Sequence, residues 1–296
     1  MFKDLDIFLR AAAAILQGID PYSIPNLEVF YPLPFYFLFI PFVSLPAPVT
    51  YALWSALSAS VLIAVLRRRV VWVALSMPVL LTFLLGQVDI VMMALFAALR
   101  SSVVAGVALA FLVLKPHLVL LLAPWMVWRW WRRDRRQIVL FSIVIATIVV
   151  LSFLVQPDWL ARFLARSGER TRAAISSSVW GLLAVLPASV WLPVSAVVVA
   201  AIVVWAWRRD NFDLVAAAGL FVSPYIFSYN LLPLLALNLS RRVLVGFTIA
   251  SWLAFGIATW QLNDRAAALI TLGVLIELAR KYRSGVRYVQ ETNTLR

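Results

Sequence analysis

Residues 128–155 have the sequence WRWWRRDRRQIVLFSIVIATIVVLSFLV, in which a cluster of arginines and tryptophans precedes a run, 138–155, that contains no charged residue. An apolar helix of about 20 residues is long enough to cross the hydrocarbon core of a bilayer. Arginines collect at the cytoplasmic ends of such helices, and tryptophans collect at the membrane surface. The stretch therefore predicts a transmembrane helix that begins on the cytoplasmic side.

The composition of the whole chain agrees with this prediction. Of the 296 residues, 64% are hydrophobic and 13% are charged, whereas soluble domains have about 45–50% apolar and about 25% charged residues. A water-soluble fold with so few polar side chains could not cover its own core, so the apolar excess has to face lipid. We therefore expect an all-α, polytopic transmembrane protein with roughly 10–12 membrane segments.

The formal net charge of +13 does not indicate nucleic-acid binding. The basic residues form short clusters at the ends of apolar segments, as the positive-inside rule predicts, at 67–69, 129–136, 208–209, 241–242 and 280–287. We interpret these clusters as topology signals of a multi-pass protein of the cell membrane. The polar turns between them are then extracytoplasmic, namely 86–89, 115–117, 157–188, 223–230 and 261–265.

A single domain is expected over residues 1–296, with two segments that do not cross the membrane. Residues 1–22 contain an amphipathic helix that should lie at the membrane interface, with an apolar face made of Leu5, Leu9, Ala12 and Leu16. Residues 157–188 form one long external loop. The segment 30–44 contains three prolines, and both a short hairpin and a full span remain open for it.

The residue types present exclude several kinds of chemistry. The chain has no cysteine and a single histidine, His117. Disulfides, thiolate catalysis and multi-histidine metal centres are therefore excluded. We expect neither a metal site nor a cofactor.

Two polar turns within apolar sequence are candidates for function. Gln87 and Asp89 lie in the turn 86–89, and ionisable groups near a bilayer are unfavourable and often functional. Helix capping is the alternative role for this turn. Lys115 and His117 could bind a phosphate at the membrane edge, although Lys115 could also be a snorkelling side chain at a helix end broken by proline.

Further candidates lie at the N-terminus and in the later external turns. Asp4 or Asp6 could accept a proton from a hydroxyl group, or could simply favour the start of a helix. Four arginines lie in the long loop that we expect to be external, where the positive-inside rule predicts few: Arg162, Arg166, Arg170 and Arg172. They favour binding of an anionic ligand or of lipid headgroups. Tyr225, Tyr229 and Asn230 offer groups suited to sugar hydroxyls, while a membrane aromatic belt explains the two tyrosines equally well.

The order of these motifs resembles the integral-membrane glycosyltransferases of the GT-C class, specifically glycosyltransferase family 87, which depends on polyprenyl-phosphate mannose. The resemblance covers nearly the whole chain. Its motifs are Asp4 with Phe8 and the alanines that follow, Asp20-Pro21-Tyr22, the aromatic and proline run 30–34, the turn 86–89, and Lys115-Pro116.

The resemblance implies transfer of a sugar, with mannose expected, from a polyprenyl-phosphate donor to a hydroxyl of a lipid or glycan acceptor. The reaction would occur at the outer membrane face, with inversion and without nucleotide, metal or other cofactor. Asp4 would be the general base, with Asp6 as the alternative. The donor phosphate would be bound by Lys115, His117, Arg162 and Arg166. The substrate pocket would include Gln87, Asp89, Tyr22, Tyr229 and Asn230. Membrane lipids are the other expected partners.

The chain departs from the pattern of this family at several positions. Family members usually have a transmembrane helix before the catalytic aspartate, whereas Asp4 lies three residues after Met1. Asp89 replaces an asparagine, and Tyr229 and Asn230 lie in a turn that typically carries tryptophan and histidine. The alternative is therefore a non-catalytic membrane protein, either an inactive remnant or a transporter. A transporter would show an internal repeat, which is not visible, and a remnant would keep Asp4 away from Gln87 and Lys115.

Overall fold

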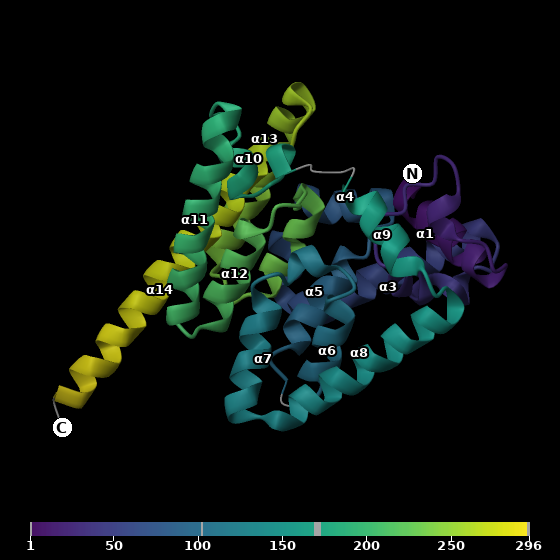
Figure 1. The fold of residues 1–296 in the computed structure, drawn as a ribbon. Helices are drawn as coiled ribbons and strands as arrows, with labels where there is room; N and C mark the ends of the chain where they lie inside the picture. Colours follow the sequence, from purple (N-terminus) through teal and green to yellow (C-terminus); the bar gives the residue numbers. More distant parts are fainter. Residues whose placement is uncertain (1, 102, 169–172, 295–296) are drawn as a thin grey trace.

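The computed structural model describes residues 2–101, 103–168 and 173–294, and the regular elements in these ranges are all helices (Figure 1). This confirms the all-α class. The α-helices are α1 Lys3–Leu16, α2 Leu33–Tyr36, α3 Ala47–Leu66, α4 Met77–Leu85, α5 Asp89–Ala98, α6 Ala105–Leu112, α7 Leu122–Arg133, α8 Arg135–Val155, α9 Trp159–Gly168, α10 Val179–Leu183, α11 Ala188–Arg208, α12 Phe212–Val222, α13 Arg241–Gln261 and α14 Ala268–Thr294. The 3-10 helices are η1 Pro21–Ser23, η2 Phe37–Phe42, η3 Arg67–Trp72, η4 Pro116–Leu118, η5 Ala173–Ile175, η6 Ser228–Ala236 and η7 Arg265–Ala267.

Four helices among the described residues are long and apolar enough to cross a membrane, namely α3 together with η3, α8, α11 and α13. The pair α4 and α5 is bent by 120° at its break and makes a fifth span if it is counted as one. Only 6% of the apolar window of α8 is buried inside the protein, so the rest of that surface has to face lipid. The multi-pass membrane architecture is confirmed. The described residues contain four or five candidate spans where roughly 10–12 membrane segments were expected, because most of the other apolar segments form shorter helices.

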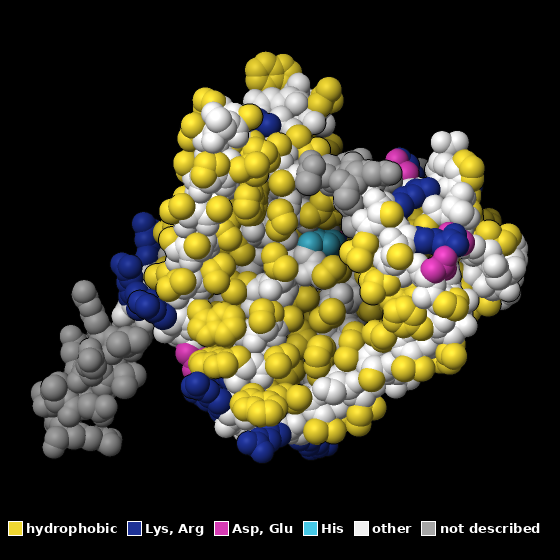
Figure 2. Space-filling model, in the orientation of Figure 1, with side chains coloured by type: hydrophobic (Ala, Val, Ile, Leu, Met, Phe, Trp, Pro, Cys, Tyr) yellow, Lys and Arg dark blue, Asp and Glu magenta, His cyan; other side chains and the backbone are white. Residues whose placement is uncertain are grey.

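Hydrophobic side chains cover most of the face shown in Figure 2, while Lys and Arg gather along its lower and left edges. Those edges correspond to the region of α7 and the start of α8, and to the region of α14 (Figures 1 and 2). A surface that is apolar over the length of the helices and basic at one end of them is typical of a protein that spans a bilayer.

The segment 30–44 is a short helical segment and not a full span. Its apolar part, Leu33–Phe42, consists of α2 followed by η2. Prolines at positions 32, 34 and 41 remove backbone donors and prevent a long α-helix. The segment packs on α1, where the ring of Phe8 lies 5.2 Å from that of Phe35 and 4.9 Å from that of Phe39.

The N-terminal helix α1 is amphipathic, as expected, but its buried face differs from the predicted one. Leu5, Phe8, Ala12 and Ile15 are buried, whereas Leu16 is 58% exposed. The difference arises because α1 packs against α2, η2 and α4, which a helical wheel cannot show.

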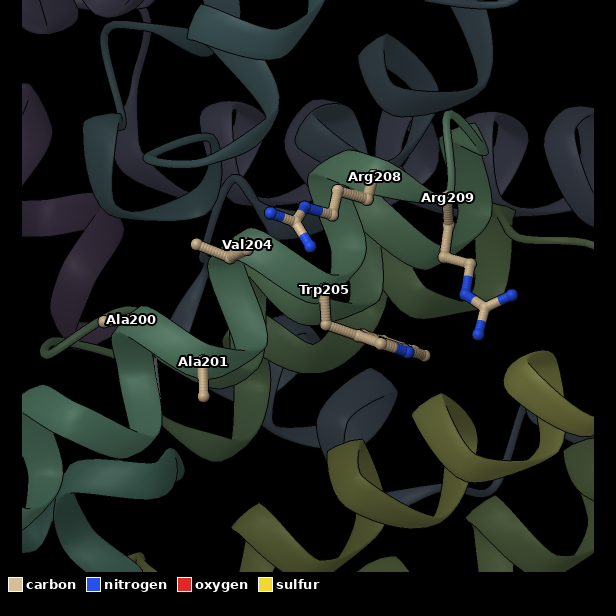
Figure 3. Close-up of a pocket in the computed structure, with 6 residues that line it drawn as sticks. All are labelled: Ala200, Ala201, Val204, Trp205, Arg208 and Arg209. Carbon is tan, nitrogen blue, oxygen red and sulfur yellow. The ribbon is translucent and has the colours of Figure 1, made fainter.

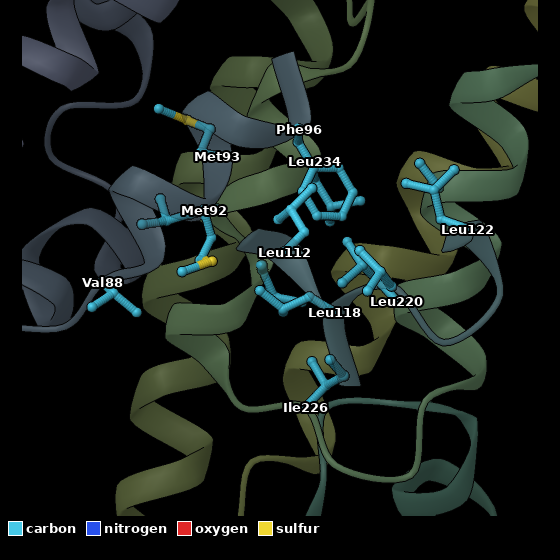
Figure 4. Close-up of a cluster of buried hydrophobic side chains, with 14 of the residues drawn as sticks. Val88, Met92, Met93, Phe96, Leu112, Leu118, Leu122, Leu220, Ile226 and Leu234 are labelled. Carbon is cyan, nitrogen blue, oxygen red and sulfur yellow. The ribbon is translucent and has the colours of Figure 1, made fainter. Parts of the chain in front are cut away.

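A continuous core lies between the helices in the middle of the protein. Figure 4 shows part of it, where side chains from α5, α6, η4, α7, α12 and η6 meet, including Met92, Phe96, Leu112, Leu118 and Leu220. The apolar residues of η6 form a 3-10 helix, with Pro233 inside it. Short and irregular backbone at this depth is tolerated because it is enclosed by protein.

Helices α6 and α8 approach closely at Gly106. A Cβ atom at this position would lie 2.3 Å from the carbonyl oxygen of Gln137 and 3.0 Å from the backbone nitrogen of Phe141. The N–H group of Gly106 also donates a hydrogen bond of 2.8 Å to Oε1 of Gln137. The absence of a side chain therefore sets how closely these two helices pack.

We predict that Gly106→Ala lowers the thermal midpoint of unfolding in detergent, because α6 and α8 have to separate; overpacking of this kind costs about 1–3 kcal/mol. The matched control is Gly246→Ala in α13, where an added Cβ atom would have no heavy atom within 4 Å. That variant should unfold at the same temperature as wild type or a higher one. Equal midpoints for the two variants would contradict the prediction.

Candidate functional site

Asp4 of α1 and Gln87 of the turn between α4 and α5 meet at a cavity of about 260 Å³. Nε2 of Gln87 donates a hydrogen bond of 2.6 Å to Oδ2 of Asp4. Within the described residues, Oε1 of Gln87 is buried and has no hydrogen-bond partner. The cavity is lined by Asp4, Ile7, Phe8, Glu28, Phe30, Tyr31, Gln87, Tyr225, Phe227 and Tyr229.

Gly86 allows α1 to come close enough for this contact. Its φ angle is +72°, and a Cβ atom there would lie 2.6 Å from Cβ of Leu5 and 3.1 Å from a ring carbon of Phe2. The N–H group of Phe2 also donates a hydrogen bond of 2.7 Å to the carbonyl oxygen of Leu84. The glycine of the turn 86–89 therefore allows the approach of α1, and the glutamine that follows it bonds the aspartate.

Burial raises the pKa of Asp4 above its ordinary value, and this effect is opposed first by the hydrogen bond from Gln87 and then by Lys115. A carboxylate with a raised pKa holds a proton more tightly and is a stronger base. The hydrogen bond engages Oδ2, and no donor among the described residues is recorded on Oδ1. Asp4 is therefore a partly buried carboxylate with one oxygen available to a substrate group.

A buried cluster of Lys115, Asp89 and Asn230 lies behind the cavity wall. Nζ of Lys115 donates a hydrogen bond of 2.7 Å to Oδ2 of Asp89, and both side chains are fully buried. Nδ2 of Asn230 donates one of 2.9 Å to Oδ1 of the same carboxylate. The rings of Tyr31 and Tyr229, which line the cavity, lie 5.4 Å and 5.5 Å from Nζ. The charged cluster thus supports the aromatic wall through cation–π contacts.

The aromatic wall continues through rings that contact each other in sequence. Tyr225 lies 5.0 Å from Phe227, which lies 6.0 Å from Tyr229. His117 lies 5.4 Å from Tyr225 and 6.3 Å from Tyr31. Cavities with aromatic walls and a few placed polar groups are typical of small-molecule binding sites.

His117 packs against this wall as a neutral group and does not itself line the cavity. Burial, with a smaller contribution from Lys115, lowers its pKa well below the usual value, so its imidazole is uncharged at pH 7. Its Nε2 atom is buried and has no hydrogen-bond partner within the described residues. The single histidine is visible in Figure 2 as a recessed group among hydrophobic side chains.

The two arginines that the resemblance assigns to the donor phosphate lie on α9 and do not line the cavity. Arg162 pairs with Asp158 at 2.6 Å and also with Asp20. Nη1 of Arg166 donates a hydrogen bond of 3.1 Å to the carbonyl oxygen of Leu27. The structure therefore does not bring these arginines together with Asp4. The other two arginines of the predicted set, at 170 and 172, lie outside the described residues.

Two further predicted residues have structural contacts outside the cavity lining. Asp6 accepts a short hydrogen bond from Oη of Tyr51, in α3. The hydroxyl of Tyr22 donates a hydrogen bond of 2.9 Å to the carbonyl oxygen of Tyr31 and so supports the backbone behind the wall. Of the substrate-pocket residues that the sequence predicts, the structure places Gln87 and Tyr229 at the cavity surface and Asp89 and Asn230 behind it.

Sequence reasoning missed Asp264, which bonds to two of the other turns that the charge pattern predicts to be external. Its Oδ2 accepts a hydrogen bond of 2.8 Å from the N–H group of Ser228, and its carbonyl oxygen accepts one of 3.1 Å from Oγ of Ser177. Burial raises the pKa of Asp264 above its ordinary value. The signal available was a carboxylate in a turn already predicted to be external. The lining residues Tyr31 and Glu28 were also not singled out as site residues, whereas Tyr225 was a candidate for binding sugar hydroxyls.

Together these contacts link all five turns that the charge pattern assigns to one side of the membrane. Turn 86–89 bonds to turn 115–117 and to turn 223–230. Turn 223–230 bonds to turn 261–265, which bonds to the loop 157–188. The polar turns therefore form one connected layer around the cavity.

A protein-family model matches a large part of the chain. The model of glycosyltransferase family 87 matches residues 30–227, which is more than half of the chain. The match confirms the resemblance noted from the motifs, and its range includes Tyr31, Gln87 and Lys115 but begins after Asp4. No curated protein and no solved structure is significantly similar to this chain.

We predict that Lys115→Met strongly destabilises the protein, because it leaves the carboxylate of Asp89 buried without its cation. Removing one partner of a buried ion pair costs about 3–5 kcal/mol. The double variant Asp89→Asn with Lys115→Met removes both charges and should recover most of the loss, as measured by thermal unfolding in detergent. Strictly additive effects of the two substitutions would show that the pair does not act as a unit.

Proposed function

This chain belongs to glycosyltransferase family 87, and on that basis we propose that it transfers a sugar from a polyprenyl-phosphate donor to a hydroxyl group of a lipid or glycan acceptor. Mannose is the proposed sugar, which makes the enzyme a hexosyltransferase. The proposed reaction inverts the anomeric centre and takes place at the extracytoplasmic face of the cell membrane. The family supports the choice of donor, and the cavity supports the roles that we propose for individual residues.

The observation that carries the proposal is the position of Asp4 at the cavity, held by Gln87 at 2.6 Å. In the proposed step, Asp4 accepts the proton of the acceptor hydroxyl as its oxygen attacks the anomeric carbon. The bond between this carbon and the phosphate oxygen breaks, and its electron pair leaves with the polyprenyl phosphate. Attack from the side opposite the leaving group gives inversion.

The same contact weighs against the non-catalytic alternative. An inactive remnant would leave Asp4 too far from the cavity for contact chemistry. Here Asp4 is within hydrogen-bonding distance of Gln87, and Lys115 is close enough to lower its pKa. The proposal of an enzyme is therefore favoured over that of a remnant or a transporter.

We propose that Lys115 and His117 interact with the donor phosphate and that the arginines of α9 do not. The ammonium group of Lys115 contributes positive potential from behind the wall formed by Tyr31 and Tyr229. Neutral His117 packs on Tyr31 and Tyr225 outside the cavity lining, and its buried Nε2 has no partner among the described residues. A phosphate oxygen reaches this nitrogen only if the two rings move aside, and Nε2 then donates a hydrogen bond to it when it carries the proton. The guanidinium groups of Arg162 and Arg166 already have partners of their own.

The lining is also suited to a sugar. The rings of Tyr31, Tyr225 and Phe227 offer apolar surfaces to the C–H groups of a hexose, whereas Gln87 and Glu28 offer polar groups to its hydroxyls. Oε1 of Gln87, which has no partner among the described residues, can accept a hydrogen bond from one of these hydroxyls.

We predict that Asp4→Asn reduces transfer of radiolabelled mannose from polyprenyl-phosphate mannose by about 10²–10⁴-fold, which is the usual range for loss of a general base. The assay uses the purified full chain with a membrane lipid extract as acceptor. Asp6→Asn is the comparison, because Asp6 bonds Tyr51 and does not line the cavity. It should retain most of the activity.

Two outcomes would overturn the assignment. Loss of transfer in Asp6→Asn but not in Asp4→Asn would make Asp6 the base. A folded wild-type protein that transfers no sugar from any of several polyprenyl-phosphate donors would favour the non-catalytic alternative. Size-exclusion profiles of all variants provide the folding control.

We also predict that Gln87→Met moves the acidic limb of the pH profile of kcat/KM to higher pH. A general base has to be deprotonated, so transfer falls as the pH drops through the pKa of Asp4. The hydrogen bond from Gln87 lowers this pKa, and methionine of similar length cannot donate one. The pKa therefore rises in the variant. A limb that stays in place or moves to lower pH would show that Asp4 is not the group being titrated.

A further inference from the structure

A basic cleft lies at the end of α11, where that helix meets α12 and α14. It has a volume of about 260 Å³, and its lining includes Trp205, Arg208 and Arg209 of the α11 end with Tyr282 and Arg283 of α14. It shares no lining residue with the cavity at Asp4.

A shallow apolar groove along α11 shares lining residues with this cleft, and Figure 3 draws the six residues that line the groove. Its lining adds Ala200, Ala201 and Val204 to the residues Trp205, Arg208 and Arg209. The alanines leave room beside the helix, and the volume of the groove is about 690 Å³. A charged cleft and an apolar groove are therefore joined through the same three residues.

The positive charge of the cleft is not balanced by nearby carboxylates. Asp210 pairs with Arg129 and Arg133, at 3.8 Å and 3.1 Å. Asp213 pairs with Arg100 and accepts a hydrogen bond of 2.6 Å from Tyr282. No ion pair is recorded for the three arginines of the cleft within the described residues, and none of the cleft's lining residues is acidic.

The cleft lies where a membrane-spanning helix ends. The candidate span α11 runs over Ala188–Arg208, so its last turn carries Trp205 and Arg208. Tryptophan and tyrosine favour the level of the lipid headgroups, and Arg208 and Arg209 are exposed there. The groove beside Ala200 and Ala201 extends from this level toward the hydrocarbon core, because it follows the helix inward.

We propose that this cleft binds the phosphate headgroup of an anionic phospholipid and that one acyl chain of the lipid lies in the groove along α11. The guanidinium groups of Arg208, Arg209 and Arg283 donate hydrogen bonds to the phosphate oxygens. The ring of Trp205 lies between headgroup and chain. Basic clefts between transmembrane helices at headgroup level are suited to such lipids. The site is independent of the proposed transfer reaction.

The experiment measures lipid binding to the purified full chain by native mass spectrometry, with dioctanoyl phosphatidylglycerol compared with dioctanoyl phosphatidylcholine. Wild type should bind the anionic lipid in preference. The double variant Arg208→Gln with Arg209→Gln should weaken this binding about tenfold or more, because each arginine near an anionic headgroup contributes to affinity. Arg68→Gln with Arg136→Gln is the control, since it removes two exposed arginines of other basic clusters.

A second variant, Ala201→Phe, fills the groove and leaves every charge in place. It should weaken binding of the diacyl lipid but not of glycerol phosphate, which separates a lipid site from a site for free phosphate. Unchanged binding in the variant of Arg208 and Arg209 would overturn the proposal. Equal weakening in the control of Arg68 and Arg136 would also overturn it, because net charge alone would then explain the affinity. Variants that unfold at the same temperature as wild type are correctly folded, which excludes misfolding as the cause of weaker binding.

Discussion

The buried ion pair between Lys115 and Asp89 is the interaction on which the arrangement of the site depends. Two fully buried charges are tolerated only if they are paired and hydrogen-bonded, and here Asn230 provides the additional donor. The three residues come from three separate turns. Their contacts therefore fix the relative positions of those turns. Tyr31 and Tyr229 pack near the same ammonium group, so the cavity wall follows from the pair.

The second constraint is the docking of α1, which carries the proposed base on a short helix. Its first residues are held by the backbone bond between Phe2 and Leu84, by the contact between Asp6 and Tyr51, and by the contact between Asp4 and Gln87. Each bond joins α1 to a helix or turn of the membrane-spanning part. Gly86 makes all of this possible, since any side chain there would collide with Leu5. Asp4 is therefore positioned by the described contacts of α1 itself.

Sequence alone could predict the helical class, the multi-pass character and four residues of the cavity, because apolar length, charge clusters and motif order are local signals. These residues are Asp4, Gln87, Tyr225 and Tyr229. It could not predict the pairing of Arg162 with Asp20, since Asp20 is far away in the chain and only the packing of α9 on η1 brings the two together. For the same reason, the buried face of α1 and the 3-10 conformation of η6 were missed. Contacts between elements that are distant in the sequence determine both features, and local sequence patterns do not indicate such contacts.

Asp89 stands where the resemblance implies an asparagine, and its charge changes how Lys115 can act on the proposed donor phosphate. A buried lysine without a carboxylate would present a full charge, whereas the pair presents a dipole, whose potential falls off faster with distance. The direction of this dipole still favours an anion in the cavity. Lys115 affects the pKa of Asp4 more strongly than Asp89 does, and the two effects are opposite. The positive end therefore acts more strongly on the cavity, and a neutral donor such as His117 can supplement it where a second cation would be unfavourable to bury.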